Sequence, residues 1–368
     1  MLRRTLRLTL WLAAALAVGG YIVLSIRMLF DAMPRGATEA AIMSQARRMA
    51  FGQTPYPEAT AGSGVPLMPA FPALVAPFVG SLGTQLWQPR LIGFLATLVL
   101  AIVAAIVVVR ETKSATLGVT SAGMLLMGQG LEWSTPAGGG PVSLLLLLVL
   151  LGGLVLRYTQ GIVGAAIASV LFSLGCFTHP SGLWFALAAL IHLAIIDPKR
   201  FWSYTIVLVA LVCGGQMAMS VALGPWFNFQ AWDASLRHVQ FQPLGILHYV
   251  GVEVLGALGV LTLATVLSFA LPTDPWRGTP AIWIWIGIAA FCAGLAATQS
   301  AVPPAYALRP AAVVLAILGP VSVQRITSHL SAWPGGTRGG AQAVVLTALV
   351  LQLVMLLAFT SPLMNPPV

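Results

Sequence analysis

One glutamate stands out in residues 38–59, TEAAIMSQARRMAFGQTPYPEA, because the chain around it is apolar and poor in carboxylates. Thr38 is a typical helix cap and Gly52 a typical helix end, so we expect a helix that runs to about Phe51. Helical spacing places Glu39 on one face with Ile42, Met43, Ala46, Met49 and Ala50. Burial raises the pKa of a carboxyl group, and this is how a general base is prepared.

A structural role for the same glutamate is equally compatible with the residues. A carboxylate on an apolar face is costly unless it is paired. Arg35 and Arg90 flank the segment, so Glu39 can form an ion pair with either of them and fix the loop. Ion-pair networks perturb carboxylates as catalytic sites do, so helical periodicity alone leaves both roles open.

The elements that position this segment are membrane spans. The chain has 368 residues, of which 58% are hydrophobic and only 7% are charged, whereas an ordinary soluble domain is about a quarter charged. Several apolar runs approach the roughly 20 residues that cross a bilayer. We therefore predict an all-α polytopic membrane protein forming a single transmembrane domain over residues 1–368, without a soluble C-terminal domain. It has about eleven spans, predicted near 8–30, 90–110, 116–133, 142–157, 161–178, 182–196, 203–224, 249–271, 281–298, 306–321 and 342–361.

Arginine and lysine residues near the span ends predict the orientation. Most of them collect on one side if the N-terminus is cytoplasmic, which places the C-terminus outside the cytoplasm. Residues 31–89 then form the largest extracytoplasmic loop. Segment 66–83 could be counted as another span, but it contains three prolines, and a span here would reverse the charge bias of everything after it. We therefore expect two interfacial helices in this loop.

The composition also excludes some classes of function. The net charge of +9 does not indicate nucleic-acid binding, because the basic residues are scattered singly at span ends. No spacing of cysteine and histidine suggests a metal site, so no metal ligands and no cofactor are predicted, although a divalent metal is not excluded. Transporters usually show repeats or charges in mid-membrane. Only Glu253 lies well inside a span, so transport ranks third.

The first loop resembles a known family. An acid, a helix carrying QARRMAFG, then TPY, a Pro-Leu, an apolar segment ending in GSLG, and an arginine opening the next span look like the first extracytoplasmic loop of GT-C-fold glycosyltransferases. These are polyprenyl-phosphate-sugar-dependent enzymes related to protein mannosyltransferases and aminoarabinose transferases. Three later segments are similar more loosely: FTHPSG (177–182), LRHVQFQPLGILHYV (236–250) and PPAYALRPAAVVLAILGP (303–320).

The resemblance implies a site on the extracytoplasmic face of a bacterial inner membrane. The family's first-loop acid, which is catalytic, falls on Glu39. The leaving phosphate of the lipid-linked donor needs positive charge, and the candidate substrate-binding residues are Arg90, His179, Arg237, Tyr306 and Arg309. Four of them have a plainer alternative: Arg90 as an anchor at a span end or partner of Glu39, His179 as a loop hydrogen-bonder, Arg237 in a local ion pair, and Tyr306 as an interface aromatic.

The expected partners are the polyprenyl-phosphate lipid and the surrounding membrane lipids. The sequence departs from the family pattern at Thr38, where many members carry aspartate, and at His179, where some carry lysine. These departures keep a second hypothesis open. In that hypothesis the chain is a catalytically inactive, GT-C-like structural subunit of a larger membrane complex.

Overall fold

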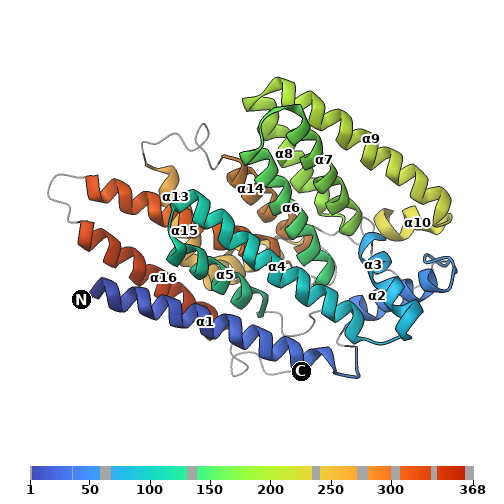
Figure 1. The fold of residues 1–368 in the computed structure, drawn as a ribbon, viewed down its shortest axis with the longest axis horizontal. Helices are drawn as coiled ribbons and strands as arrows, with labels where there is room; N and C mark the ends of the chain where they lie inside the picture. The colour runs from blue at the N-terminus through green and yellow to red at the C-terminus, as the bar shows by residue number, and fades with distance from the viewer. Residues whose placement is uncertain are drawn as a thin grey trace.

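The computed structural model describes residues 2–34, 36–58, 68–130, 139–233, 241–271, 281–299, 307–332 and 338–360, and every regular element among them is a helix (Figure 1). In chain order these are α1 (Leu2–Leu29), α2 (Ala37–Ala50), α3 (Ala70–Leu82), α4 (Trp87–Thr112), α5 (Ala115–Gly130), α6 (Gly140–Tyr158), α7 (Gly161–Thr178), α8 (Gly182–Ile196), α9 (Pro198–Ala222), α10 (Trp226–Asn228), η1 (Phe229–Asp233), α12 (Pro243–His248), η2 (Tyr249–Val254), α13 (Leu255–Phe269), α14 (Ala281–Thr298), α15 (Arg309–Ala332) and α16 (Arg338–Thr360). The elements η1 and η2 are short π-helices.

The predicted spans all coincide with helices. Eight described helices are long and apolar enough to cross a membrane, and α12, η2 and α13 together make one of them, Pro243–Phe269. Shorter apolar helices account for the remaining spans. The segment that we expected to lie at the interface forms α3, which has 13 residues and is too short to cross a bilayer. The prediction of an all-α polytopic membrane protein is confirmed.

Some predicted boundaries were wrong. Helix α2 begins at Ala37, so Thr38 lies inside its first turn, and the N-cap residue Gly36 makes no side-chain capping bond. Its end is as expected, since Gly52 adopts a positive φ of 66° directly after the last turn. Helix α15 continues to Ala332, well beyond the predicted span end at 321. The apolar pattern marks the part of the helix that lies within the membrane, whereas the helix itself continues beyond that part.

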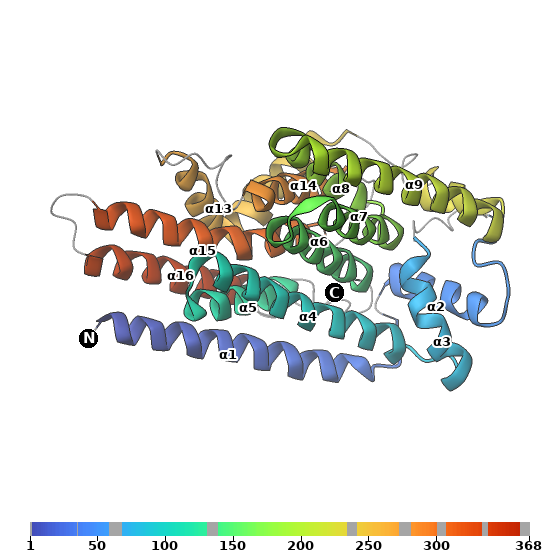
Figure 2. The same ribbon diagram turned by 45° about the horizontal axis from the view of Figure 1, so that its top comes forward.

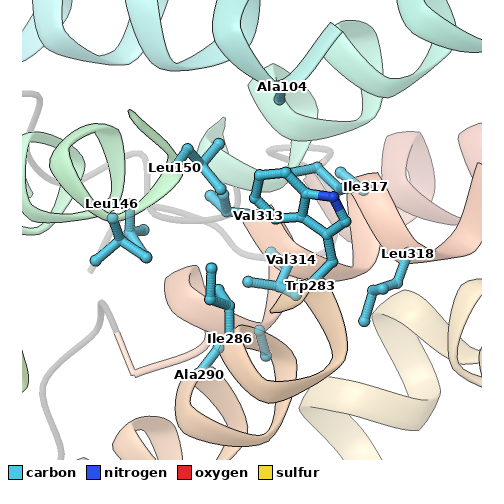
Figure 3. Close-up of a cluster of buried hydrophobic side chains, with 14 of the residues drawn as sticks. Ala104, Leu146, Leu150, Trp283, Ile286, Ala290, Val313, Val314, Ile317 and Leu318 are labelled. Atoms are coloured by element: carbon cyan, nitrogen blue, oxygen red, sulfur yellow. The ribbon is translucent and has the colours of Figure 1, made fainter. Parts of the chain in front are cut away.

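The bundle core lies where α4, α6, α14 and α15 meet, around the indole of Trp283 (Figure 3). Trp283 belongs to α14, is 1% exposed, and is the largest fully buried side chain among the described residues. The α6 backbone comes close to it at Gly153, where an added Cβ would lie 2.7 Å from the indole ring. Trp283 thus sets the spacing between α6 and α14.

Helices α2 and α3 lie at one end of the bundle, beside the C-terminal end of α9 (Figures 1 and 2). Helices α2 and α3 pack through a small apolar cluster that includes Ile42 and Phe71. The TPYP segment is fastened to the loop after α9: the buried ring of Tyr56 meets the ring of Phe227 at 5.1 Å, and the side-chain amide of Gln230 donates to the carbonyl of Pro57.

Candidate active site

Glu39 and Arg90, which the sequence placed 51 positions apart, form a buried ion pair. The Arg90 Nε lies 2.5 Å from Glu39 Oε1, and Nη2 lies 3.1 Å from Oε2. Glu39 is 0% exposed and Arg90 is 1% exposed. The geometry therefore favours the ion pair that the sequence analysis left as one of two roles for Glu39.

The rest of the Arg90 guanidinium binds the turn between α1 and α2. Nη1 donates to the carbonyls of Met28 and Asp31 at 2.9 and 2.5 Å, and Nη2 donates to the carbonyl of Met33 at 2.8 Å. A guanidinium has five N–H donors, and five acceptors surround this one. Arg90 consequently has no donor left for a substrate phosphate in this conformation. It joins the end of α1, the start of α2 and the start of α4.

Gln88, two residues before Arg90, forms a second set of hydrogen bonds between the first loop and α4. Its side-chain amide donates to the carbonyls of Phe78 and Gly83, at 3.2 and 2.7 Å, and so holds the end of α3 against the start of α4. Gln88 is 1% exposed. Helices α2 and α3 thus form a cap at this end of the bundle, held to the first two turns of α4.

Arg309 provides a buried positive charge beneath this cap. It is the first residue of α15 and is 5% exposed. Its guanidinium lies against Gly139, where an added Cβ would be only 1.3 Å from Nη1. The next residue, Gly140, lies close to the ring of Phe71 from α3. A Cβ added to Gly140 would be 2.4 Å from that ring. The two glycines therefore let α6 begin between the cap helix α3 and Arg309.

A set of buried hydroxyl groups lies near Arg309, and the sequence analysis missed it. Tyr21 of α1 interacts electrostatically with Arg309 and lies close to Thr97 and Ser25. The Thr97 Oγ1 lies 2.8 Å from the Ser143 Oγ of α6. A helical signal was present: Tyr21 and Ser25 are four residues apart in α1, so they share a face. Single hydroxyls in apolar helices are common, however, and only the fold shows that they converge.

His179 lies at the junction of α7 and α8, at the same end of the bundle. Its Nδ1 accepts a hydrogen bond from the Ser181 backbone N–H at 3.2 Å and lies 2.8 Å from the Ser181 Oγ. Burial lowers the pKa of His179 to about 4, so the ring is neutral at pH 7. A neutral ring that accepts at Nδ1 carries its proton on Nε2. His179 can thus donate one hydrogen bond but brings no positive charge to a phosphate.

The remaining sequence candidates have different outcomes. Arg237 and Tyr306 lie outside the described residues, so their roles stay predictions. Within the described ranges, no three side chains of histidine, cysteine, aspartate or glutamate come together as a metal site. The described part of the candidate site therefore consists of a sealed ion pair, a buried arginine surrounded by hydroxyls, and a neutral histidine.

Several solved structures have the same arrangement of helices as this chain. The structure of ArnT from Cupriavidus metallidurans bound to undecaprenyl phosphate matches with a TM-score of 0.60 and 14% identity, over 93% of this chain and 76% of that one. The Archaeoglobus fulgidus oligosaccharyltransferase in complex with Zn and sulfate matches with a TM-score of 0.59 and 14% identity, over 96% of this chain and 53% of that one. The chain has the GT-C fold.

The same archaeal oligosaccharyltransferase, AglB, also matches in its complex with an inhibitory peptide and a dolichol-phosphate, with a TM-score of 0.54 and 13% identity over 96% of this chain and 56% of that one. The chain therefore spans about half the length of the archaeal enzyme. No family model matches the sequence, and no curated protein shows significant similarity to it. ArnT, an aminoarabinose transferase, and AglB are polyprenyl-phosphate-dependent GT-C glycosyltransferases, which confirms the predicted resemblance at the level of the fold.

Proposed function

We propose that the chain is an integral membrane glycosyltransferase that transfers a sugar from a polyprenyl-phosphate carrier to an acceptor. The GT-C fold supports this, since ArnT has been seen with undecaprenyl phosphate and AglB with a dolichol-phosphate. The observation that carries the proposal is the buried guanidinium of Arg309 at the capped end of the bundle. A cation kept inside a membrane domain is costly, and such residues commonly mark a ligand site.

The capped end faces the periplasm in this proposal, and the protein resides in a bacterial inner membrane. At the opposite end of the bundle, the helix ends and links carry Arg110, Lys113, Arg157, Lys199 and Arg200. Cytoplasmic segments of membrane proteins are enriched in lysine and arginine. The N-terminus of α1 lies at this basic end (Figures 1 and 2), which supports the proposed cytoplasmic N-terminus.

Sugar transfer requires a stabilised leaving group and an acceptor that loses its proton. Arg309 holds the leaving phosphate, because its planar guanidinium can bind two phosphate oxygens at once. His179, at the junction of α7 and α8, contacts the substrate in this proposal. The cap formed by α2 and α3 keeps the site closed to bulk water, and the Glu39–Arg90 pair holds the cap in place.

Sugar transfer from a radiolabelled polyprenyl-phosphate-sugar panel, with native membrane extract as acceptor, tests the proposal. Wild-type protein should transfer label, and Arg309→Ala should reduce kcat/KM by about 10²-fold, since a preorganised donor of this kind contributes that much. Arg27→Ala is the matched control, because Arg27 is an exposed arginine near the same end. Folded wild-type protein that transfers no sugar from any donor would overturn the proposal.

The second candidate function is a GT-C-fold subunit that has lost catalysis. The sealed Glu39–Arg90 pair favours it, because both oxygens of the acid that the family resemblance makes catalytic are occupied. For such a subunit, Glu39→Gln and Arg309→Ala should lower thermal stability, and neither wild type nor variant should turn over any donor. Transfer by the wild type would exclude it.

A further inference from the structure

A second carboxylate of the bundle lies in a different setting from Glu39. Glu253 is inside the apolar segment Pro243–Phe269, in the short π-helix η2. Carboxylates within membrane spans are costly and usually have a function. Single π-helical turns within α-helices are also frequent at functional sites, because they displace side chains from the regular helical positions. Two independent features therefore coincide at Glu253.

Glu253 is accessible and lightly held. Its side chain is 33% exposed, and its only charge partner among the described residues is His248, whose Nε2 lies 3.8 Å from Oε1. This distance is longer than a hydrogen bond. The His248 side chain is 62% exposed. A carboxylate in this state can accept a proton from a substrate, and the imidazole beside it can receive that proton in turn.

Tyr249 connects this turn with the Arg309 region. It is fully buried, and its hydroxyl has no hydrogen-bond partner within the described ranges. A Cβ added to Gly294 would lie 1.9 Å from this hydroxyl and 2.8 Å from the carbonyl of Ala307, two residues before Arg309. Tyr249 also interacts electrostatically with Glu253. The side chain of Tyr249 thus extends from the Glu253 turn to the start of α15.

The surface around Glu253 and His248 is apolar and faces outward. Phe241 is 81% exposed, Leu244 is 79% exposed and Leu247 is 68% exposed. In a membrane span such side chains lie against lipid, so a hydroxyl carried by a lipid can approach Glu253 from the bilayer. A lipid-borne acceptor can place its apolar chain against this surface and its hydroxyl group beside Glu253 and His248.

We propose that Glu253 is the carboxylate that takes the proton from the hydroxyl of a lipid-borne acceptor, and that His248 passes this proton to water. The inference rests on the proposed glycosyltransferase function. The acceptor oxygen forms a bond to the anomeric carbon of the sugar, and the bond between that carbon and the phosphate oxygen breaks. The electron pair stays with the polyprenyl phosphate, and the acceptor proton goes to Glu253, which becomes a carboxylic acid until His248 removes the proton.

Three carboxamide variants in the transfer assay test this assignment: Glu253→Gln, Glu39→Gln and, as a matched control, the exposed first-loop residue Glu58→Gln. Removing a general base should cost about 10²–10⁴-fold. We expect this loss in the kcat of Glu253→Gln, with little change in KM or thermal stability. Glu39→Gln should mainly lower stability, and Glu58→Gln should match the wild type. Wild-type kcat should rise with pH, and this rise should disappear in Glu253→Gln.

The two proposals fail in different ways. If the wild type transfers sugar and Glu253→Gln retains its kcat, Glu253 is not the base and the glycosyltransferase function stands. If the wild type transfers nothing, the glycosyltransferase function and the catalytic role of Glu253 both fall.

Discussion

The two ends of α4 each hold a buried charge, and they hold it differently. At the capped end, Arg90 gives two donors to Glu39 and three to backbone carbonyls. At the basic end, Glu111 receives three donors on one oxygen: Arg157 Nε at 3.2 Å, the Tyr158 hydroxyl at 2.9 Å and Trp283 Nε1 at 3.3 Å. The first arrangement excludes water completely, whereas Arg157 is 24% exposed.

Arg90 and Glu111 each lie at the end of α4 where the helix dipole disfavours their charge. The helix dipole favours anions near the N-terminus and cations near the C-terminus, yet α4 carries Arg90 in its first turn and Glu111 in its last. Each charge therefore depends on partners from other helices. Helix α4 is therefore held by tertiary contacts at both ends, and the capped end depends on its partners more strongly.

Removing the guanidinium of Arg90 should have the largest effect on stability. Arg90→Ala leaves Glu39 buried without its partner, and three backbone carbonyls lose their hydrogen-bond donor. Breaking a buried ion pair from one side costs about 3–5 kcal/mol. We expect the thermal unfolding temperature of the purified protein to fall sharply. Glu39→Gln, which keeps the shape and removes the charge, should fall less. Wild-type stability in Arg90→Ala would show that the pair does not hold the cap.

The corresponding change at the basic end should be milder. Glu111→Gln keeps an oxygen that can accept from Tyr158 and Trp283, and it loses only the charge opposite Arg157. The expected loss is about 1.5–3 kcal/mol, the range for a hydrogen bond to a charged group. The two thermal unfolding curves should be compared in the same detergent. A loss equal to that of Arg90→Ala would remove the proposed difference between the two ends.

The spans were predictable from the sequence because a bilayer imposes a length and a composition on every helix that crosses it. The apolar face of α2 was predictable for a similar reason, since its period of 3.6 residues is local. Ile42, Met43 and Ala46 are buried there as expected. Gln45 is also buried, although the pattern did not assign it to that face. The start of α2 was mispredicted because a threonine can also stand within a first turn.

The candidate site was predictable only in part. The pairing of Glu39 with Arg90 depends on how the first loop folds back over α4, and no local pattern encodes this. The hydroxyls of Tyr21, Thr97 and Ser143 come from three helices, so their meeting is a property of the packing. The π-helix at Glu253 likewise leaves no periodic signal, because its segment reads as an ordinary apolar span.

Gly139 offers a way to disturb the capped end without breaking its ion pair. A Cβ there would lie 1.3 Å from the Arg309 Nη1, so the guanidinium must move. Its φ of −86° is open to alanine. Gly139→Ala should therefore weaken undecaprenyl phosphate binding about 10-fold, or about 1.4 kcal/mol. A ligand-induced shift in unfolding temperature measures it. Gly214→Ala is the control, because nothing lies within 4 Å of that position. Equal binding by both variants would show that Arg309 does not bind the phosphate.

His179 should produce the smallest effect, seen as a pH dependence at the capped end. Burial lowers its pKa in the folded protein to about 4 from the ordinary value of about 6.5. The unfolded chain therefore binds the proton more readily between these values, and stability should fall as the pH drops from about 6.5 toward 4. Between pH 7 and pH 6 the loss amounts to less than about 1 kcal/mol. His179→Gln should flatten this part of the stability profile, whereas substitution of the exposed His248 should leave it unchanged. A wild-type slope in His179→Gln would mean that acid sensitivity arises elsewhere, and that the ring of His179 is free to carry the positive charge that a phosphate needs.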